Sequence, residues 1–434
     1  MIHCIMTNTK SVVSLCYTFI MLNYAQKKVL ILALFAGEIM MKSGAEIYRV
    51  EDTIVRICKA CGVDHAECFA TTTGIFLSID KRGEDSGMNT YIKRIKGSEI
   101  NLAKISAVNT FSRVFTTTDL SIDDGFEQLR KINAEPRFGP VVRLIGAILV
   151  GVFFCPIFGG AIGDMIVAGV ISGITYLISC GIARLNINNF IRIFISCMAA
   201  AGMVLAAAAI GFSDTISPVV VAATTIFLPG VAITNAARDL LSGDMLSGVA
   251  RAAEAAVTAV AIAGGVGIGI QLWLLGGGEI VHERMTYFGT PWFLLFGFFS
   301  TLGFGILFNA PKKLLIPVSV IGAVGMYLLE GMTIDYNVIS ASFFGTCAIA
   351  IMAEIASRAG KDATTIFIIP GIIPFVPGKP LYETMRLMLM SEYTDAVSTG
   401  TQALLIAGCI AIALVLIATF ARLVLAIGSR LKAP

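Results

Sequence analysis

The stretch TTIFLPG at residues 224–230 decides the fold, because it places a helix-breaking Pro-Gly pair inside apolar sequence. A second version, TTIFIIPG, follows at residues 364–371. The echo extends to a weaker pair, FGGAIGDMIVAGVISGITYL at 158–177 and FNAPKKLLIPVSVIGAVGMYL at 308–328. We interpret the hydrophobic region as two copies of one structural unit. Interruptions at matching places in two halves of a membrane protein are the best sequence pointer to a transport site.

Composition assigns the chain to the membrane proteins. Of its 434 residues 56% are hydrophobic and only 14% are charged, whereas soluble chains carry about 25% charged residues. The charges concentrate in residues 25–138, and beyond them apolar runs approach the ~20 residues that span a bilayer. The net charge is +3, and no basic stretch is dense enough to indicate a nucleic-acid partner. The chain is therefore predicted to be a polytopic membrane protein with a polar N-terminal domain.

The polar region is predicted to form a cytosolic α+β domain at 25–138, preceded by an uncertain N-terminal extension at 1–24. Apolar residues at helical spacing favour helices, and β-branched runs favour strands. Pro136 is expected to end the domain. The predicted elements are a long helix at 25–62 that stops near Gly62, strands at 66–80 and 88–96 around a turn at 81–87, and helices at 99–115 and 122–133.

The membrane region is predicted to be α-helical, with about ten transmembrane helices. Basic residues collect on the flanks that a cytosolic N-terminal domain would place inside, whereas the outside flanks hold only Arg284, Lys379 and Arg386. Both termini are therefore expected in the cytoplasm. Five spans per copy make the second copy inverted, so the fold is two inverted five-helix repeats, at 139–275 and 286–430. The predicted spans are 141–158, 162–181, 190–211, 216–236, 248–273, 287–308, 313–330, 338–357, 363–378 and 400–421.

Both broken spans supply candidate substrate-binding groups. Proline frees backbone carbonyls, and such backbone is tolerated at membrane depth only where it is buried in protein or lines a wet cavity. Half-helix ends carry partial charges that suit a small anion or zwitterion. The threonine hydroxyls would bond either a ligand or their own helix backbone. The predicted substrate-binding residues are Thr224, Thr225, Pro229, Gly230, Asn235, Asp239, Thr364, Thr365, Pro370, Gly371, Pro377 and Gly378.

Charged residues near the spans and in the polar domain are candidates for coupling or gating, because charges inside a bilayer are costly. Glu254 lies three residues after Arg251, and Glu354 lies four before Arg358, so each is either an interface ion pair or a proton-coupling group. Glu46 and Arg49 can pair in the same way. The coupling or gating set is Arg238, Glu254, Glu354, Glu46, Arg49 and Glu51.

No motif in the sequence indicates catalysis, a cofactor or a bound metal. The Walker A pattern does not occur, and no nucleophile–base set stands out. Cys58 and Cys61, with His65 and Cys68 nearby, only loosely resemble a zinc site and fit no standard finger. The chain is therefore expected not to be an enzyme.

At this point the motifs resemble the threonine/serine exporter family (ThrE-like), including its split relatives of the YjjP and YjjB type, from about residue 25 to 430. The resemblance rests on GAEIYRVEDT at 44–53, on PG, TN, RD and GD between 229 and 244, and on LGFG, NAP and IPG between 302 and 371. Cys61 departs from the pattern, since a non-thiol residue is expected there. The resemblance implies export of threonine and serine, or of a dicarboxylate such as succinate.

The prediction is a secondary transporter of the inner membrane that exports small polar metabolites and is driven by the proton gradient. Its partners are the small-molecule substrate and the lipid bilayer, and a homo-oligomer is left open. Two alternatives stay open. The N-terminal domain could process or sense a metabolite, which an assay of fragment 25–138 would reveal, or the membrane half could be a passive channel insensitive to an uncoupler.

Overall fold

The computed structural model describes residues 27–63, 65–80, 89–136, 138–279 and 285–431, and the chain divides into two compact units. Unit 1 holds the residues up to Ile100 together with Lys104–Glu135, and unit 2 holds Asn101–Ala103 and the chain from Pro136 onward. The predicted extension at 1–24, the predicted turn at 81–87 and Arg284 lie outside the described residues.

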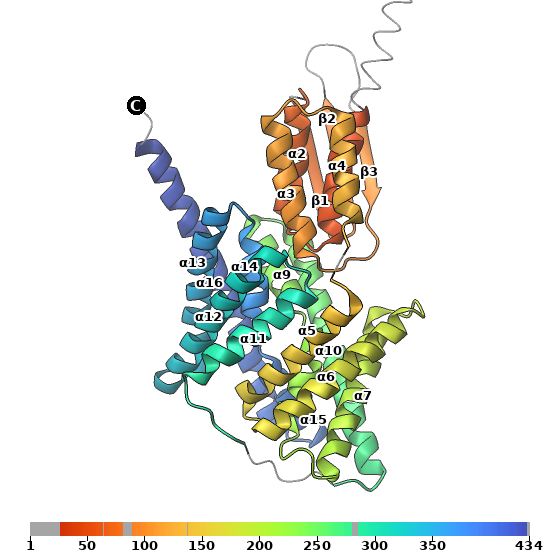
Figure 1. Cartoon of the computed structure of the whole chain (residues 1–434), viewed down its shortest axis with the longest axis vertical. Coiled ribbons are helices and arrows are strands. Elements are labelled where there is room, and N and C mark those ends of the chain that lie inside the picture. The colour runs from red at the N-terminus through yellow and green to blue at the C-terminus, as the bar shows by residue number, and fades with distance from the viewer. Residues whose placement is uncertain (1–26, 64, 81–88, 137, 280–284, 432–434) are drawn as a thin grey trace, which may run out of the picture. The chain divides into compact units, whose positions relative to one another are not determined.

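Unit 1 combines helices with a three-stranded antiparallel sheet in the order β1-β2-β3 (Figure 1). Ile75, Leu77 and Ile79 of β2 are buried while Phe76 between them is exposed, so one face of the sheet packs into the core. Gly37 of the first helix lies against Ile54 and Ile75. The elements are a helix at 27–42, α2 (Ile47–Ala60), β1 (His65–Thr71), β2 (Gly74–Asp80), β3 (Asn89–Arg94), α3 (Leu102–Thr117) and α4 (Ile122–Ala134).

Two predictions for this region are wrong in detail. The predicted helix at 25–62 is two helices, because the chain turns after residue 42 and Gly44 adopts φ +83°, a conformation that glycine tolerates best. The predicted strand at 66–80 is a hairpin, with Phe69 of β1 paired to Phe76 of β2. A run of that length exceeds the usual strand of five or six residues, so it folds back on itself.

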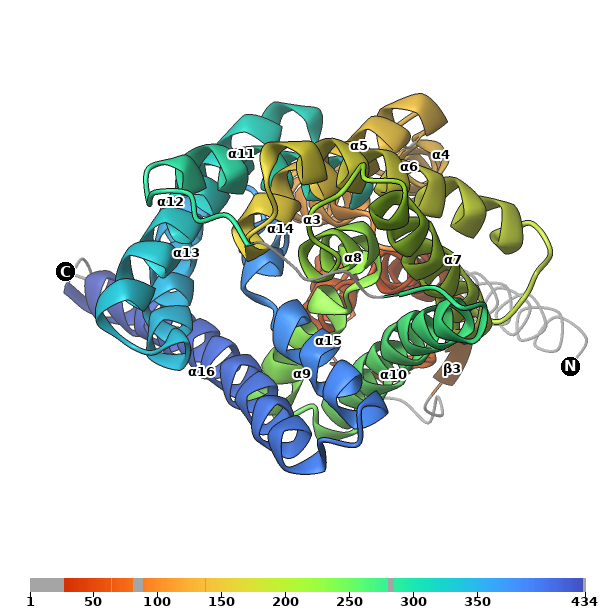
Figure 2. The same cartoon turned by 90° about the horizontal axis from the view of Figure 1, so that it is seen from below.

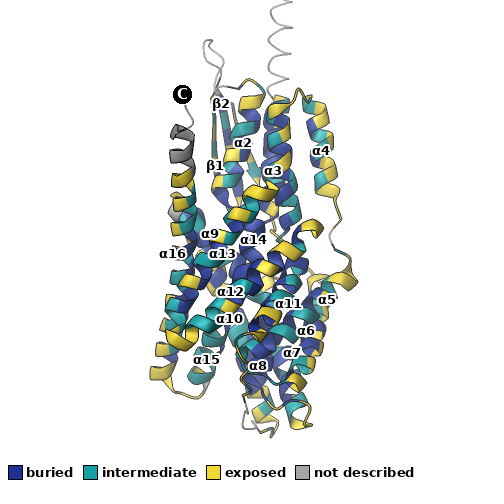
Figure 3. Ribbon diagram, turned by 60° about the vertical axis from the view of Figure 1, so that its left-hand side comes forward, coloured by how far each residue is buried: buried dark blue, intermediate teal, exposed yellow. Residues whose placement is uncertain are grey.

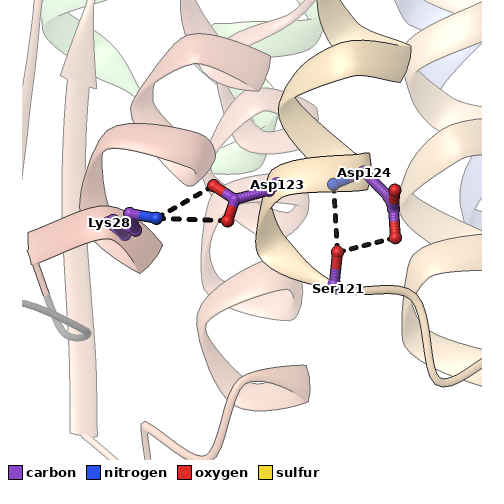
Figure 4. A network of polar contacts seen from close by, with 4 residues as sticks. All are labelled: Lys28, Ser121, Asp123 and Asp124. Carbon is purple, nitrogen blue, oxygen red and sulfur yellow. Dashed lines mark hydrogen bonds and ion pairs between the residues drawn. The ribbon is translucent and has the colours of Figure 1, made fainter.

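The start of α4 was predicted near Ser121 or Asp123, and local chemistry explains it. Ser121 caps the helix by accepting a hydrogen bond from the Asp124 N–H at 3.1 Å, as its side-chain oxygen is suited to do (Figure 4). Asp123 in the first turn pairs with Lys28 Nζ at 3.0 Å, which ties α4 to the first helix (Figure 4).

Unit 2 is helical. Among the described residues, eight helices are long and apolar enough to cross a membrane, and a ninth span results if the bent α8–α9 pair counts as one. The prediction of ten spans also needs α11, an apolar helix of 16 residues. The elements are α5 (Pro140–Phe154), η1 (Cys155–Phe158), α6 (Ile162–Ala183), α7 (Asn189–Ala209), α8 (Ser217–Thr224), η2 (Thr225–Phe227), α9 (Gly230–Ser242), α10 (Met245–Leu275), α11 (Trp292–Leu307), η3 (Lys312–Leu314), α12 (Leu315–Asp335), α13 (Val338–Gly360), α14 (Thr364–Ile372), η4 (Ile373–Phe375), α15 (Gly378–Leu389) and α16 (Tyr393–Leu431).

The broken helices form the interior of unit 2. Figure 2 shows α8, α14 and α15 inside a surround made by the longer helices. All eight residues of α8 are buried, and nearly all of α14 is buried as well (Figure 3). Small residues let the surrounding helices approach closely: a Cβ on Gly269 of α10 would lie 2.7 Å from the Met198 carbonyl oxygen of α7. The most buried helices of unit 2, α8 and α14, are therefore the ones that lead into the breaks.

Candidate functional site

The two broken helices follow the same backbone course. In the first, Leu228 is extended (φ −56°, ψ 130°) and Pro229 turns the chain (φ −79°, ψ 41°) before α9 begins. In the second, Val376 (φ −59°, ψ 131°) and Pro377 (φ −72°, ψ 58°) repeat these angles before α15 begins. A residue that precedes proline is biased away from the helical region, which is consistent with the extended angles of Leu228 and Val376.

Element boundaries also repeat at constant spacing. Residues 225, 230 and 245, which begin η2, α9 and α10, correspond to residues 373, 378 and 393, which begin η4, α15 and α16, and each pair lies 148 residues apart. Further upstream, Asn188 and Asn337 cap the starts of α7 and α13, 149 residues apart. The segment that matches TIFLPG at 225–230 is therefore IPFVPG at 373–378.

The predicted pairing of Pro229-Gly230 with Pro370-Gly371 is wrong. Pro370 lies inside α14, where it lacks the N–H that would bond the Ile366 carbonyl, yet the helix continues past it. The break comes seven residues later, at Pro377-Gly378. TTIFIIPG resembles the first motif in sequence, but Ile369 before Pro370 stays helical, and the extended residue before proline occurs at the later site, at Val376.

Each break packs against the other. A Cβ added to Gly230 would collide with Ile373 Cδ1 and lie 3.2 Å from Val376 Cγ2. A Cβ on Gly378 would lie 3.1 Å from Leu228 Cδ1, tighter than ordinary van der Waals contact. A side chain at either position would have to displace side chains of the opposite break, so glycine allows the two breaks to approach closely. The two Pro-Gly breaks thus cross in direct contact with each other.

A cavity of about 30 Å³ adjoins this crossing. That volume has room for a water molecule and little more, so the crossing is closed in this structure. The lining residues are Val221, Thr224, Thr225, Leu228, Ala259, Ile262, Ala263, Val266, Gly378, Leu381, Tyr382 and Met385. Of the predicted substrate-binding residues, Thr224, Thr225 and Gly378 line it, whereas Asn235, Asp239, Thr365 and Gly371 lie outside its lining.

The threonines of the breaks use their hydroxyls in different ways. Thr224 donates to the Val220 carbonyl at 2.8 Å, and Thr225 donates to the Val221 carbonyl, so both bond their own helix. The lone pairs of these hydroxyls can still accept a hydrogen bond. Thr364 contacts Ser357 Oγ at 3.1 Å. Thr365 is buried, and within the described residues its hydroxyl has no hydrogen-bond partner.

Asp239 is neutralised by a cation that the sequence reading did not pair with it. Its carboxylate lies 2.9 Å from Arg251 Nε of α10, and both side chains are buried. Arg251 was considered as a partner of Glu254, but Glu254 is exposed. Asn235 lies one turn before Asp239 and is fully buried, while Arg238 is half-buried. A charged pair inside the protein is costly to break, so this contact joins α9 firmly to α10.

The starts of the broken helices are held by polar contacts, through hydrogen bonds at α8 and through an ion pair at α14. Asp164, at the start of α6, accepts hydrogen bonds from Ser213 Oγ at 2.7 Å and from the Asp214 N–H at 2.9 Å, just before α8. Just before α14, Asp362 pairs at 3.1 Å with Lys313, which begins the second helix of its own half. Asp164 and Lys313 lie 149 residues apart, so a polar contact recurs at the matching place with a lysine where the first has an aspartate.

The other predicted coupling residues form structural ties. Glu354 pairs with Arg358 at 3.5 Å, as their spacing predicts. In unit 1, the predicted Glu46–Arg49 pair is present at 3.2 Å with Glu46 buried. Glu51 accepts a hydrogen bond from the Ala70 N–H of β1 at 2.7 Å, which covers part of an edge strand.

The thiols of Cys58 and Cys68 in unit 1 are held in their protonated form by burial. Burial raises the pKa of Cys58 to about 12, and burial likewise raises the pKa of Cys68 to about 12. A thiol must lose its proton to become a metal ligand, and these thiols stay protonated at neutral pH. Among the residues that the structure describes, no group of three or more His, Cys, Asp or Glu side chains is placed to hold a metal ion.

Sequence reasoning missed the residues of α10 and α15 that line the cavity. Ala259 and Ala263 of α10 and Tyr382 and Met385 of α15 line it, although no motif marks them. One signal was present in α10: alanine and glycine recur throughout residues 252–269, and a helix rich in such residues is built for close approach. That signal predicts a packing face, but it does not say what the face packs against.

Comparison with known proteins finds two family models and several relatives that are similar to this chain. Two family models match, ThrE over residues 31–273 and ThrE_2 over residues 294–420, both described as threonine/serine exporter. A threonine/serine exporter of Corynebacterium glutamicum is 22% identical over 402 residues, which cover 87% of this chain and 80% of the relative.

Two further relatives match in part. The probable succinate transporter subunit YjjP of Klebsiella aerogenes is 26% identical over 251 residues, 55% of this chain and 91% of the relative. An uncharacterized protein of Haemophilus influenzae is 26% identical over 123 residues, so this chain, matched over 28% of its length, spans 39% of that relative. No solved structure matches.

Proposed function

The chain belongs to the threonine/serine exporter family, and we propose that it is a secondary transporter that exports threonine and serine from the cell. The observation that carries this proposal is the reciprocal packing of Gly230 and Gly378 at the crossing of two broken helices. Broken helices that meet between two halves of a membrane protein are the usual place for a transported solute. The Corynebacterium glutamicum relative, named a threonine/serine exporter, supports the choice of substrate.

The proposed architecture is ten spans in two inverted five-helix repeats, 139–275 and 286–430, with both termini in the cytoplasm and the chain in the inner membrane. The constant spacing of 148 residues between matching elements supports the repeat. An odd number of spans per repeat turns the second copy over. The contacts of Asp164 and of Lys313 would then lie on opposite sides of the membrane.

Transport is proposed to proceed by separation of the two breaks. The cavity at the crossing is too small for an amino acid, so the closed structure has to open before a solute can pass. Half-helices joined through Leu228-Pro229 and Val376-Pro377 can tilt without breaking regular hydrogen bonds, because those bonds are already interrupted there. Opening toward one side and then the other would carry the solute across.

The half-helix starts at Gly230 and Gly378 are proposed to receive the substrate carboxylate, since backbone N–H groups at a helix start favour anions. Asp239 and Asn235 are the proposed acceptors for the amino group. Arg251 is paired with Asp239 in the closed structure, so the amine would have to displace Arg251 or bind between Arg251 and Asp239. Glu254, exposed on α10, is kept as a proposed proton-coupling group, and Arg238, whose guanidinium stays charged, is kept as a proposed gating group.

The alternative substrate is a dicarboxylate such as succinate, which the Klebsiella aerogenes relative favours by its name, a probable succinate transporter subunit. A dicarboxylate has no amine, so it makes no use of Asp239. Unit 1 is proposed to modulate transport and not to catalyse a reaction. The tie between Glu46 and Arg49 supports a structural part for these charges within that unit.

The test is efflux from cells preloaded with threonine, serine or succinate, with and without the full-length protein. Threonine and serine efflux should rise with the protein and fall when an uncoupler removes the proton gradient. Succinate efflux alone would replace the substrate with the dicarboxylate. Efflux of threonine unaffected by the uncoupler would replace proton-driven transport with a passive channel.

Topology is tested separately by thiol labelling of intact cells in a cysteine-free background. Glu279→Cys, in the loop between the proposed repeats, should react with an impermeant reagent added outside. Lys432→Cys should react only after the membrane is opened. Labelling of residue 432 from outside would defeat the arrangement of ten spans with both termini inside.

A further inference from the structure

The cavity beside Gly378 borders both broken helices at once. The end of α8 and η2 form one wall, α15 forms another, and α10 closes the third. A solute held where the breaks cross therefore has this cavity next to it. Resting on the proposed function, we infer that the cavity receives the side chain of the transported amino acid, and that Ala259, Ala263 and Tyr382 set the largest side chain accepted.

The lining determines which chemistry the cavity can take. None of its twelve residues is charged, so a second carboxylate or an amine would lose its hydration there without an ion partner. The polar atoms are the hydroxyls of Thr224, Thr225 and Tyr382. Thr224 and Thr225 donate to their own helix, which leaves their oxygens to accept a hydrogen bond from a substrate hydroxyl. A short neutral side chain, with or without a hydroxyl, matches the chemistry of this lining once separation of the breaks has enlarged the cavity.

The wall formed by α10 limits the size of the substrate side chain that the cavity can hold. Ala259 and Ala263 lie four residues apart, so they lie on the same face of the helix one turn from each other. Both are half-buried, so a longer side chain at either position would extend into the cavity instead of into a neighbouring helix. Met385 lines the cavity from α15 and is the longest flexible side chain among the lining residues.

The threonine hydroxyls of the cavity come from the first break only, while the Tyr382 hydroxyl comes from α15. The residues 148 positions after Thr224 and Thr225 are Ile372 and Ile373, which are buried and apolar. The matching position to Tyr382 in the first half is Thr234, whose hydroxyl donates to the Gly230 carbonyl at 2.8 Å. The threonine pair is therefore a feature of the first break that the second break does not repeat, and it gives the two sides of the cavity different polar groups.

The experiment measures counterflow of labelled glycine, serine, threonine, valine and leucine by the purified full-length protein in liposomes. Ala263→Leu fills the cavity, so KM for threonine should rise about tenfold or more while KM for glycine changes less than about twofold. Met385→Ala enlarges the cavity and should admit leucine. Ala256→Leu is the matched control, because Ala256 is exposed on the same helix, and its selectivity should equal that of the unaltered protein.

Equal loss of glycine and threonine transport in Ala263→Leu would overturn the inference, and so would continued exclusion of leucine by Met385→Ala. The second variant removes atoms, so it tests the pocket even if the first does not fold. Failure of the proposed function has a different signature, since the unaltered protein would then show no counterflow of any amino acid.

Discussion

The two breaks share a backbone and differ in their side chains. Leu228-Pro229 and Val376-Pro377 have nearly equal angles, yet the first break carries a threonine pair where the second carries isoleucines. The helix that follows the first break, α9, is also tied to α10 by the Asp239–Arg251 ion pair. At the matching places in the second half stand Leu387 and Thr399, which cannot form an ion pair. Proline and glycine thus fix the shape of a crossing, while the residues around it assign polar chemistry to one side.

The largest effect is expected at the glycines that the breaks share. Gly230→Leu and Gly378→Leu should each abolish transport, because the added side chain would meet the opposite break. Gly202→Leu is the matched control, since nothing among the described residues lies within 4 Å of a Cβ there. Efflux of threonine from preloaded cells, normalised to the amount of protein in the membrane, is the measurement. Normal efflux in both break variants would remove the crossing from the transport path.

The next effect concerns the ion pair of the first half. Asp239→Leu, which copies the second half, should destabilise the protein by about 3–5 kcal/mol, because it leaves Arg251 buried without its carboxylate. The double variant Asp239→Leu, Arg251→Thr copies both positions and should recover most of that stability. Thermal unfolding in detergent measures the difference. A double variant no more stable than the single one would show that the pair does not account for the loss.

A smaller effect is expected from the hydroxyls. Thr224→Ile combined with Thr225→Ile makes the first break resemble the second, and should weaken threonine transport by about 2- to 10-fold, the worth of one hydrogen bond. Valine transport should fall less, since valine has no hydroxyl to lose a partner. The ratio of KM values for threonine and valine is the measurement, and an unchanged ratio would count against hydroxyl recognition.

The smallest effect is expected at the ion pair of Lys313 in the second half. Lys313 is 69% exposed, so Lys313→Ala should cost at most about 1 kcal/mol of unfolding free energy. Asp164 in the first half is buried and accepts several hydrogen bonds, so Asp164→Ala should cost more. Comparing the two unfolding midpoints checks the order, and equal costs would contradict the difference in burial.

Much of the fold was predictable because local rules decide it. Apolar run length indicated where membrane helices lie, and residue spacing predicted the Glu46–Arg49 and Glu354–Arg358 pairs. Local rules failed where two conformations were both locally acceptable. Residues 66–80 suit one long strand or a hairpin, and pairing of Phe69 with Phe76 selected the hairpin.

The candidate site was less predictable than the fold. The threonine pair and Gly378 were found because they lie in or beside a conspicuous motif, and they line the cavity. Tyr382 and the alanines of α10 were missed, since a cavity wall made of ordinary residues has no sequence signature. The tenth span also stays a prediction, because α11 is shorter than the helices that qualify by length.

By itself, the sequence determined that the chain is a membrane protein with a polar N-terminal region and proline-glycine breaks in apolar helices. These properties depend on the chemistry of a few adjacent residues, so the sequence alone is enough to predict them. Only the tertiary structure decided that Pro377, and not Pro370, matches Pro229, and that Arg251 pairs with Asp239. Those outcomes depend on which distant segments come within contact distance, and short-range spacing along a chain does not contain that information.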